Sequence, residues 1–64
     1  MDLESIVGRV REEFREMPGL RLTLAQATRL WGLERETAHA VIEQLVACAF
    51  LRWTPSGSIT RAGG

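Results

Sequence analysis

Four side chains within one short stretch of the chain can form hydrogen bonds with nucleic-acid bases: Arg35, Thr37, His39 and Gln44. A guanidinium can donate two parallel hydrogen bonds to guanine, and a side-chain amide can pair with adenine. Simpler roles are also open, because Arg35 can pair with nearby carboxylates, a lone exposed histidine is commonly solvated, and Gln44 comes late enough to contact phosphate or solvent. The stretch therefore predicts a binding surface and leaves the contact made by each side chain open.

Catalytic and metal-binding chemistry are not expected. His39 has no second ligand at the spacing of a metal site, and no serine or cysteine is placed with a histidine and an acid. No glycine-rich loop that could hold a phosphate is visible, and the chain has too few residues for a substrate cleft. We predict a protein that is not an enzyme and that has no metal and no cofactor.

Length and composition indicate one small domain over residues 1–64, with 45% hydrophobic residues. No apolar run is long enough to cross a membrane, and the first residues lack the basic start and apolar core of a secretory signal. Cys48 is the single cysteine, so no internal disulfide can form, and its apolar neighbours predict a small buried side chain. A cytoplasmic protein without membrane contact is expected.

The charges are balanced overall but unevenly distributed. Eight arginines, with no lysine, face eight acidic residues, so the formal net charge is zero. Residues 34–47 hold three glutamates against one arginine, a net charge of −2. Because affinity for nucleic acid comes mainly from phosphate neutralisation, Arg29, Arg52 and Arg61 are the expected anchors of any phosphate-binding surface.

Hydrophobic spacing and turn residues predict the first two elements. Apolar residues at three- and four-residue steps predict a helix over residues 2–17, with Asp2 as its N-cap and Pro18 at its end. Alternating apolar and polar residues predict a short strand over residues 20–22. The amphipathic first helix is also the element expected to form a homodimer.

Two helices hinged at a glycine are predicted next. Thr23 and Gln26 match a capping box that starts a helix over residues 24–31, and Gly32 can take the left-handed conformation that ends it. A third helix is predicted over residues 35–47. Its expected buried positions are Ala38, Val41, Ile42, Leu45 and Val46, and its expected exposed positions are Arg35, Glu36, His39, Ala40, Glu43, Gln44 and Ala47.

A β-hairpin is predicted over residues 50–61, because residues that favour strands flank a turn with proline second and glycine last. Trp53 should cover the edge of the core, with an exposed role in partner binding as the alternative, and Arg52 should point the other way. Residues 62–64 are expected to fray. The predicted fold is α+β, with three helices and a three-stranded antiparallel sheet in the order α-β-α-α-β-β.

Residues 20–61 carry a family resemblance. The residues that carry it are Leu22-Thr23-Leu24-Ala25-Gln26-Ala27, Leu30-Trp31-Gly32-Leu33, Thr37-Ala38, Val41-Ile42, Leu45-Val46, Phe50-Leu51-Arg52 and Thr54-Pro55-Ser56-Gly57. With them the chain resembles the winged helix-turn-helix DNA-binding domains of bacteria. The resemblance implies that the third helix lies in the major groove of double-stranded DNA, with the hairpin tip near phosphate or the minor groove.

Three positions depart from the pattern of that family. Glu34 stands where Asp or Ser commonly caps the third helix, and Trp53 stands where a basic residue is common. Ala49 stands where a glycine often precedes the Phe-Leu pair, which would be unfavourable if the position needs a positive φ.

Two functions follow as hypotheses. The first is a DNA-binding transcription regulator that uses the four side chains of the third helix named above, together with Arg29, Arg52 and Arg61. The alternative is a winged helix that binds another protein through the acidic face of its third helix or through Trp53.

Overall fold

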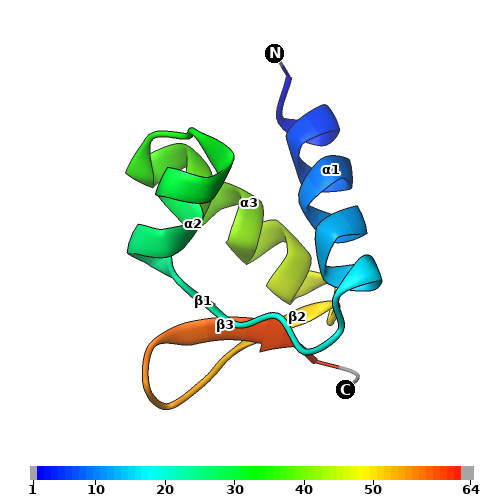
Figure 1. The fold of residues 1–64 in the computed structure, drawn as a ribbon. Coiled ribbons are helices and arrows are strands. Elements are labelled where there is room, and N and C mark those ends of the chain that lie inside the picture. The colour runs from blue at the N-terminus through cyan, green and yellow to red at the C-terminus, as the bar shows by residue number, and fades with distance from the viewer. Residues whose placement is uncertain (1, 63–64) are drawn as a thin grey trace.

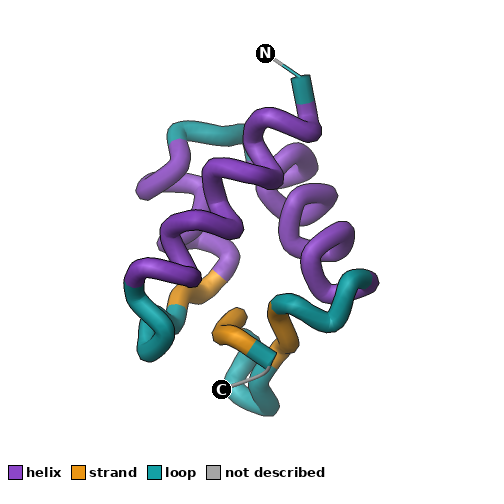
Figure 2. The backbone as a smooth tube through the Cα atoms, turned by 90° about the vertical axis from the view of Figure 1, so that its right-hand side faces the viewer, coloured by secondary structure: helices purple, strands orange, loops and turns teal. Residues whose placement is uncertain are grey.

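Between residues 2 and 62, the part of the chain that the computed structural model describes, there are three helices and three strands (Figure 1). The elements are α1 (Leu3–Glu16), β1 (Leu22–Thr23), α2 (Leu24–Trp31), α3 (Arg35–Ala47), β2 (Leu51–Trp53) and β3 (Ser58–Arg61). The antiparallel sheet has the strand order β1-β3-β2 and lies below the helices in both Figure 1 and Figure 2. The predicted α+β fold and its element order are confirmed.

The first strand lies later in the chain than predicted. β1 covers Leu22–Thr23 instead of residues 20–22, because the Leu20 backbone N–H donates to the carbonyl of Met17 at 2.9 Å and closes a turn there. The pairing of Leu22 with Ile59 then fixes the register against β3.

The hydrophobic core is a single cluster to which all three helices and the sheet contribute. Its fully buried large side chains are Phe14, Ile42, Leu45, Leu51, Ile59, Val10 and Val41. The apolar side of α1 faces this core, and only Leu3 and Met17 near its two ends are exposed, at 39% and 50%. The face of α1 that was expected to form a dimer is therefore used largely within this chain.

Local hydrogen bonds explain where the helices begin and end. The Ser5 backbone N–H donates to the carboxylate of Asp2 at 2.7 Å, and hydrogen bonding from Ser5 lowers the pKa of Asp2 below its ordinary value. Thr23 and Gln26 form the predicted reciprocal capping box, with bonds of 2.9 and 3.1 Å, and Gly32 ends α2 at φ 66°. These contacts make the helix-turn-helix corner well defined.

The predictions for Cys48 and for the tail at residues 62–64 have different outcomes. The prediction that Cys48 is buried is wrong, because Cys48 follows the last residue of α3, where the chain turns away, and its side chain is exposed. Of the tail expected to fray, Ala62 still donates its backbone N–H to the carbonyl of Phe50 at 3.0 Å, and residues 63–64 lie outside the described part of the chain.

None of the helices in residues 2–62 is long and apolar enough to cross a membrane.

Ala49 has the left-handed backbone conformation that its sequence context suggested, with φ 60°. The Phe50 backbone N–H donates to the carbonyl of Leu45 at 2.9 Å, so this conformation closes the end of α3. A Cβ atom is unfavourable in this conformation, so Ala49→Gly removes an unfavourable contact from the folded state. Glycine also has greater conformational freedom in the unfolded chain, which offsets part of this gain. We expect a net rise in the free energy of unfolding of about 0.5–1 kcal/mol. Thermal denaturation followed by circular dichroism measures the change.

The control for this prediction is Ala40→Gly in the middle of α3, where a glycine should lower stability by about 1 kcal/mol. Opposite signs for the two substitutions are expected. A loss of stability in Ala49→Gly would show that the left-handed conformation at this position is not costly to the protein.

Candidate nucleic-acid interface

The two sides of α3 are sharply different. Ala38, Val41, Ile42 and Leu45 are at most 1% exposed, and they fix the rotation of the helix against the core. The seven positions predicted to be exposed are all exposed. The outward face of α3 is therefore left uncovered by residues 2–62, because burying its other side leaves this face pointing to solvent.

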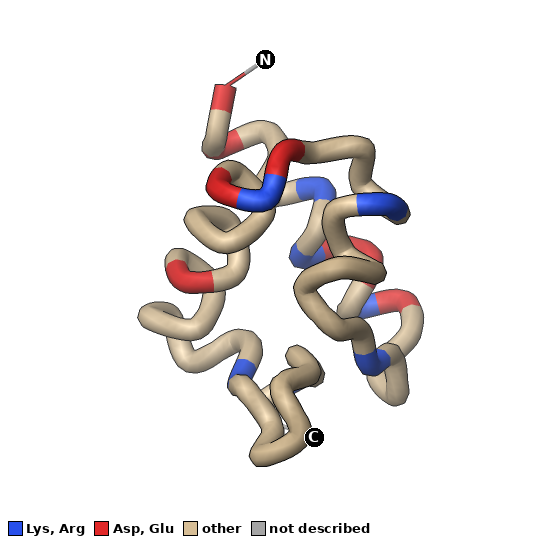
Figure 3. Tube along the Cα trace, turned by 90° about the vertical axis from the view of Figure 1, so that its left-hand side faces the viewer, with Lys and Arg blue, Asp and Glu red and all other residues tan. Residues whose placement is uncertain are grey.

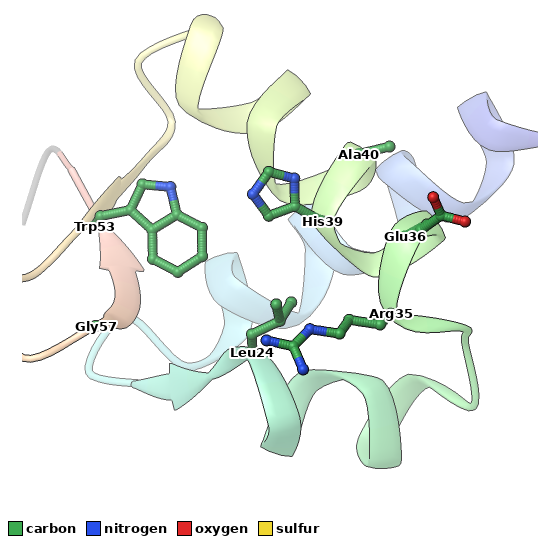
Figure 4. Close-up of a pocket in the computed structure, with 7 residues that line it drawn as sticks. All are labelled: Leu24, Arg35, Glu36, His39, Ala40, Trp53 and Gly57. Atoms are coloured by element: carbon green, nitrogen blue, oxygen red, sulfur yellow. The ribbon is translucent and has the colours of Figure 1, made fainter.

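A hollow of about 650 Å³ lies between this face and the wing, by which we mean β2, β3 and the turn that joins them (Figure 4). Its lining residues are Leu24, Arg35, Glu36, His39, Ala40, Trp53 and Gly57. In Figure 4 the Arg35 side chain extends toward Leu24, the indole of Trp53 lies on the side of His39, and Glu36 lies at the end away from Trp53. The hollow thus has an apolar wall on the wing and charged groups on the helix.

A side-chain bridge joins the wing to α3. The indole Nε1–H of Trp53 donates to Oε2 of Glu43 at 3.0 Å, and Nε2 of His39 lies 3.8 Å from the same oxygen. The rings of His39 and Trp53 have their centroids 6.1 Å apart at an interplanar angle of 31°. Because the His39 and Glu43 side chains are 53% and 51% exposed, the bridge contributes more to the orientation of the wing than to stability.

The predicted helix residues are only partly brought together. Arg35 and His39 line the same hollow, whereas Gln44 is exposed further along α3 and Thr37 is half-buried. Glu36 belongs to the acidic helix face of the alternative prediction, whereas Leu24, Ala40 and Gly57 were not predicted as site residues. The spacing of Ala40 four residues after Glu36 on the exposed face of α3 was a usable signal.

The three arginines expected to contact phosphate have different surroundings. Arg29 is exposed in the last turn of α2, and Arg52 is exposed on β2, pointing away from Leu51 as predicted. Arg61 is half-buried, with its guanidinium carbon 4.8 Å from the ring centroid of Phe50, and its Nε is buried without a hydrogen-bond partner among the described residues. Arg29 and Arg52 are therefore the more accessible of the three.

The two tryptophans both pack against the core, and both are half-buried. Trp53 covers the edge of the core as expected and also forms one wall of the hollow, and its alternative role in partner binding stays a prediction. Trp31 packs near the corner between α2 and α3, and its Nε1 has no hydrogen-bond partner among residues 2–62.

The charges do not form one strongly basic face. Basic and acidic positions are scattered along the trace in the view of Figure 3. The described residues contain no group of three or more His, Cys, Asp or Glu side chains that could hold a metal ion. Comparisons of the chain with protein-family models, with curated proteins and with solved structures gave no match, so the site itself is the basis for a functional proposal.

Proposed function

We propose that this protein binds double-stranded DNA as part of a bacterial transcription regulator in the cytoplasm. The observation that carries the proposal is the uncovered face of α3, which presents Arg35 and His39 beside the wing and Gln44 further along the helix. An α-helix fits the major groove of B-DNA, and side chains near the start of such a helix can reach base edges. In this arrangement the hairpin lies over the neighbouring sugar-phosphate backbone.

The acidic residues at and near α3 oppose DNA binding less than their number suggests, because few of them lie in the hollow. Glu34 lies before α3 at the N-cap position, where its side chain makes no capping hydrogen bond, and Glu43 accepts the hydrogen bond from Trp53. Only Glu36 lines the hollow. Arg29 and Arg52 are exposed and are the proposed phosphate contacts outside the groove.

Homodimer formation is part of the proposal, because the net charge is zero and one copy can neutralise few phosphates. Two linked copies bind with an effective concentration that raises affinity without any new contact. Since the apolar side of α1 is largely in the core, a dimer through α1 would use its exposed ends, where Leu3 and Met17 lie.

The test is fluorescence anisotropy with a labelled duplex of mixed sequence, titrated at several salt concentrations. If Arg29 and Arg52 of one copy each neutralise one phosphate, the logarithm of affinity should fall with the logarithm of salt at a slope of about −2, roughly a 12-fold loss between 50 and 200 mM. Arg52→Ala should reduce the size of that slope by about 1. Absence of binding at low salt, from protein shown to be folded, would contradict the proposal.

A second candidate function is protein binding, and the apolar wall of the hollow is the observation that favours it. Leu24, Ala40 and Trp53 offer an apolar surface next to the acidic Glu36. Under this reading, Trp53→Ala removes binding to a partner protein and leaves duplex affinity unchanged. Failure of the folded protein to bind any duplex would favour this candidate over the first.

A further inference from the structure

The charged side chains at the start of α3 differ in the hydrogen bonds they can make. The guanidinium of Arg35 only donates, and the carboxylate of Glu36 only accepts. Both line the hollow, and neither forms an ion pair or a side-chain hydrogen bond with any residue between 2 and 62. Their full hydrogen-bonding capacity is therefore available to a ligand.

Glu36 differs in this freedom from Glu43, the other glutamate within α3. The carboxylate of Glu43 is held by the Trp53 indole at 3.0 Å and does not line the hollow. Glu36 follows Arg35 in the chain, and its carboxylate points to the side of Ala40, away from the Arg35 guanidinium, which extends toward Leu24 (Figure 4). A carboxylate in this position weakens contact with phosphate, and it favours donor groups over acceptors on any base edge that it meets.

The hydrogen-bonding groups on the base edges in the major groove determine which base can offer a donor to the Glu36 carboxylate. Cytosine presents its N4 amino group as a donor, whereas adenine presents its N6 amino group beside the N7 acceptor, which repels a carboxylate. Guanine presents two acceptors, O6 and N7, that match the two donors of an arginine fork. Arg35 and Glu36 are thus suited to opposite members of G·C pairs.

We infer that α3 reads a G·C-containing half-site, with Arg35 contacting a guanine and Glu36 accepting from the N4 amino group of a nearby cytosine. The inference rests on the proposed function, because it assigns a base preference to the same face. Glu36 then supplies specificity at the expense of non-specific affinity, which fits a chain with a formal net charge of zero.

The experiment is selection from a pool of duplexes with a randomised central segment, followed by affinity measurements on the selected sequence and its single-base variants. The wild-type protein should enrich a site with adjacent guanine and cytosine contacts and should lose about tenfold in affinity when the cytosine pair is replaced. Glu36→Gln should move the preference at that position from cytosine to adenine, because a side-chain amide pairs with N6 and N7 of adenine. The preference for guanine should remain.

Glu16→Gln is the matched control, since it makes the same change in charge at an exposed position at the end of α1. It should leave the selected site unchanged. Binding of the mixed-sequence pool without a cytosine preference, or the same preference in Glu36→Gln as in the wild type, would overturn this inference and leave the proposed function standing. Absence of binding to every duplex would overturn both.

Discussion

Phe14→Ala is expected to remove roughly half or more of the free energy of unfolding at 25 °C. The side chain is 0% exposed and lies on the apolar side of α1, in its last turn. Loss of a buried phenylalanine costs about 3–5 kcal/mol, and a domain of this size has a total stability of roughly 3–10 kcal/mol. Urea denaturation followed by circular dichroism would measure the loss.

Leu3→Ala is the control for Phe14→Ala because it lies on the same apolar stripe but is 39% exposed. We expect it to cost less than about 1 kcal/mol, since a partly exposed side chain loses little burial when it is shortened. If Phe14→Ala left the melting temperature nearly unchanged and instead dissociated a dimer, the stripe would be a contact between subunits and the account of the core would be wrong.

The second large effect is expected for Arg35→Ala in DNA binding. Loss of a bidentate contact to guanine should weaken binding to the selected duplex by about 1–3 kcal/mol, or roughly 5- to 150-fold. The melting temperature should change little, because Arg35 is exposed and makes no side-chain hydrogen bond or ion pair within residues 2–62. Fluorescence anisotropy with the selected duplex, and with a duplex in which the guanine is replaced, measures the loss of affinity. Thermal denaturation measures the melting temperature.

Arg11→Ala is the matched control, because it removes the same charge from an exposed position of α1, away from the hollow. It should alter affinity only slightly and equally for both duplexes. Equal losses for the two variants would show that Arg35 contributes general charge and does not contact a base.

Much of the fold could be predicted because it is encoded by local signals. The capping box at Thr23 and the glycine at the end of α2 fix that helix from neighbours only a few residues away. The apolar spacing of α3 likewise predicted its buried and exposed sides, because a regular helix converts spacing directly into direction, although Val46, which was expected to be buried, is half-buried. The positive φ at Ala49 was predicted only as a condition, because the family resemblance places a glycine at that position.

The features that sequence reasoning missed depend on contacts between distant residues. The position of β1 is fixed by pairing between Leu22 and Ile59, which no local pattern reports. The hydrogen bond between Trp53 and Glu43 joins different elements, as does the proximity of Leu24 to Arg35 in the hollow. Cys48 was placed wrongly because its apolar neighbours do not show where the chain leaves the helix.

The central claim is that the outward face of α3 is the surface that contacts DNA. Its most direct test is titration of the isotope-labelled protein with a duplex while backbone amide chemical shifts are followed by NMR. We predict the largest shifts in residues 35–44 of α3, with further shifts at Trp53 and Gly57 on the wing and small ones on the outer face of α1. Shifts confined to α1, or no shifts at a protein and duplex concentration that would saturate a micromolar site, would contradict the account.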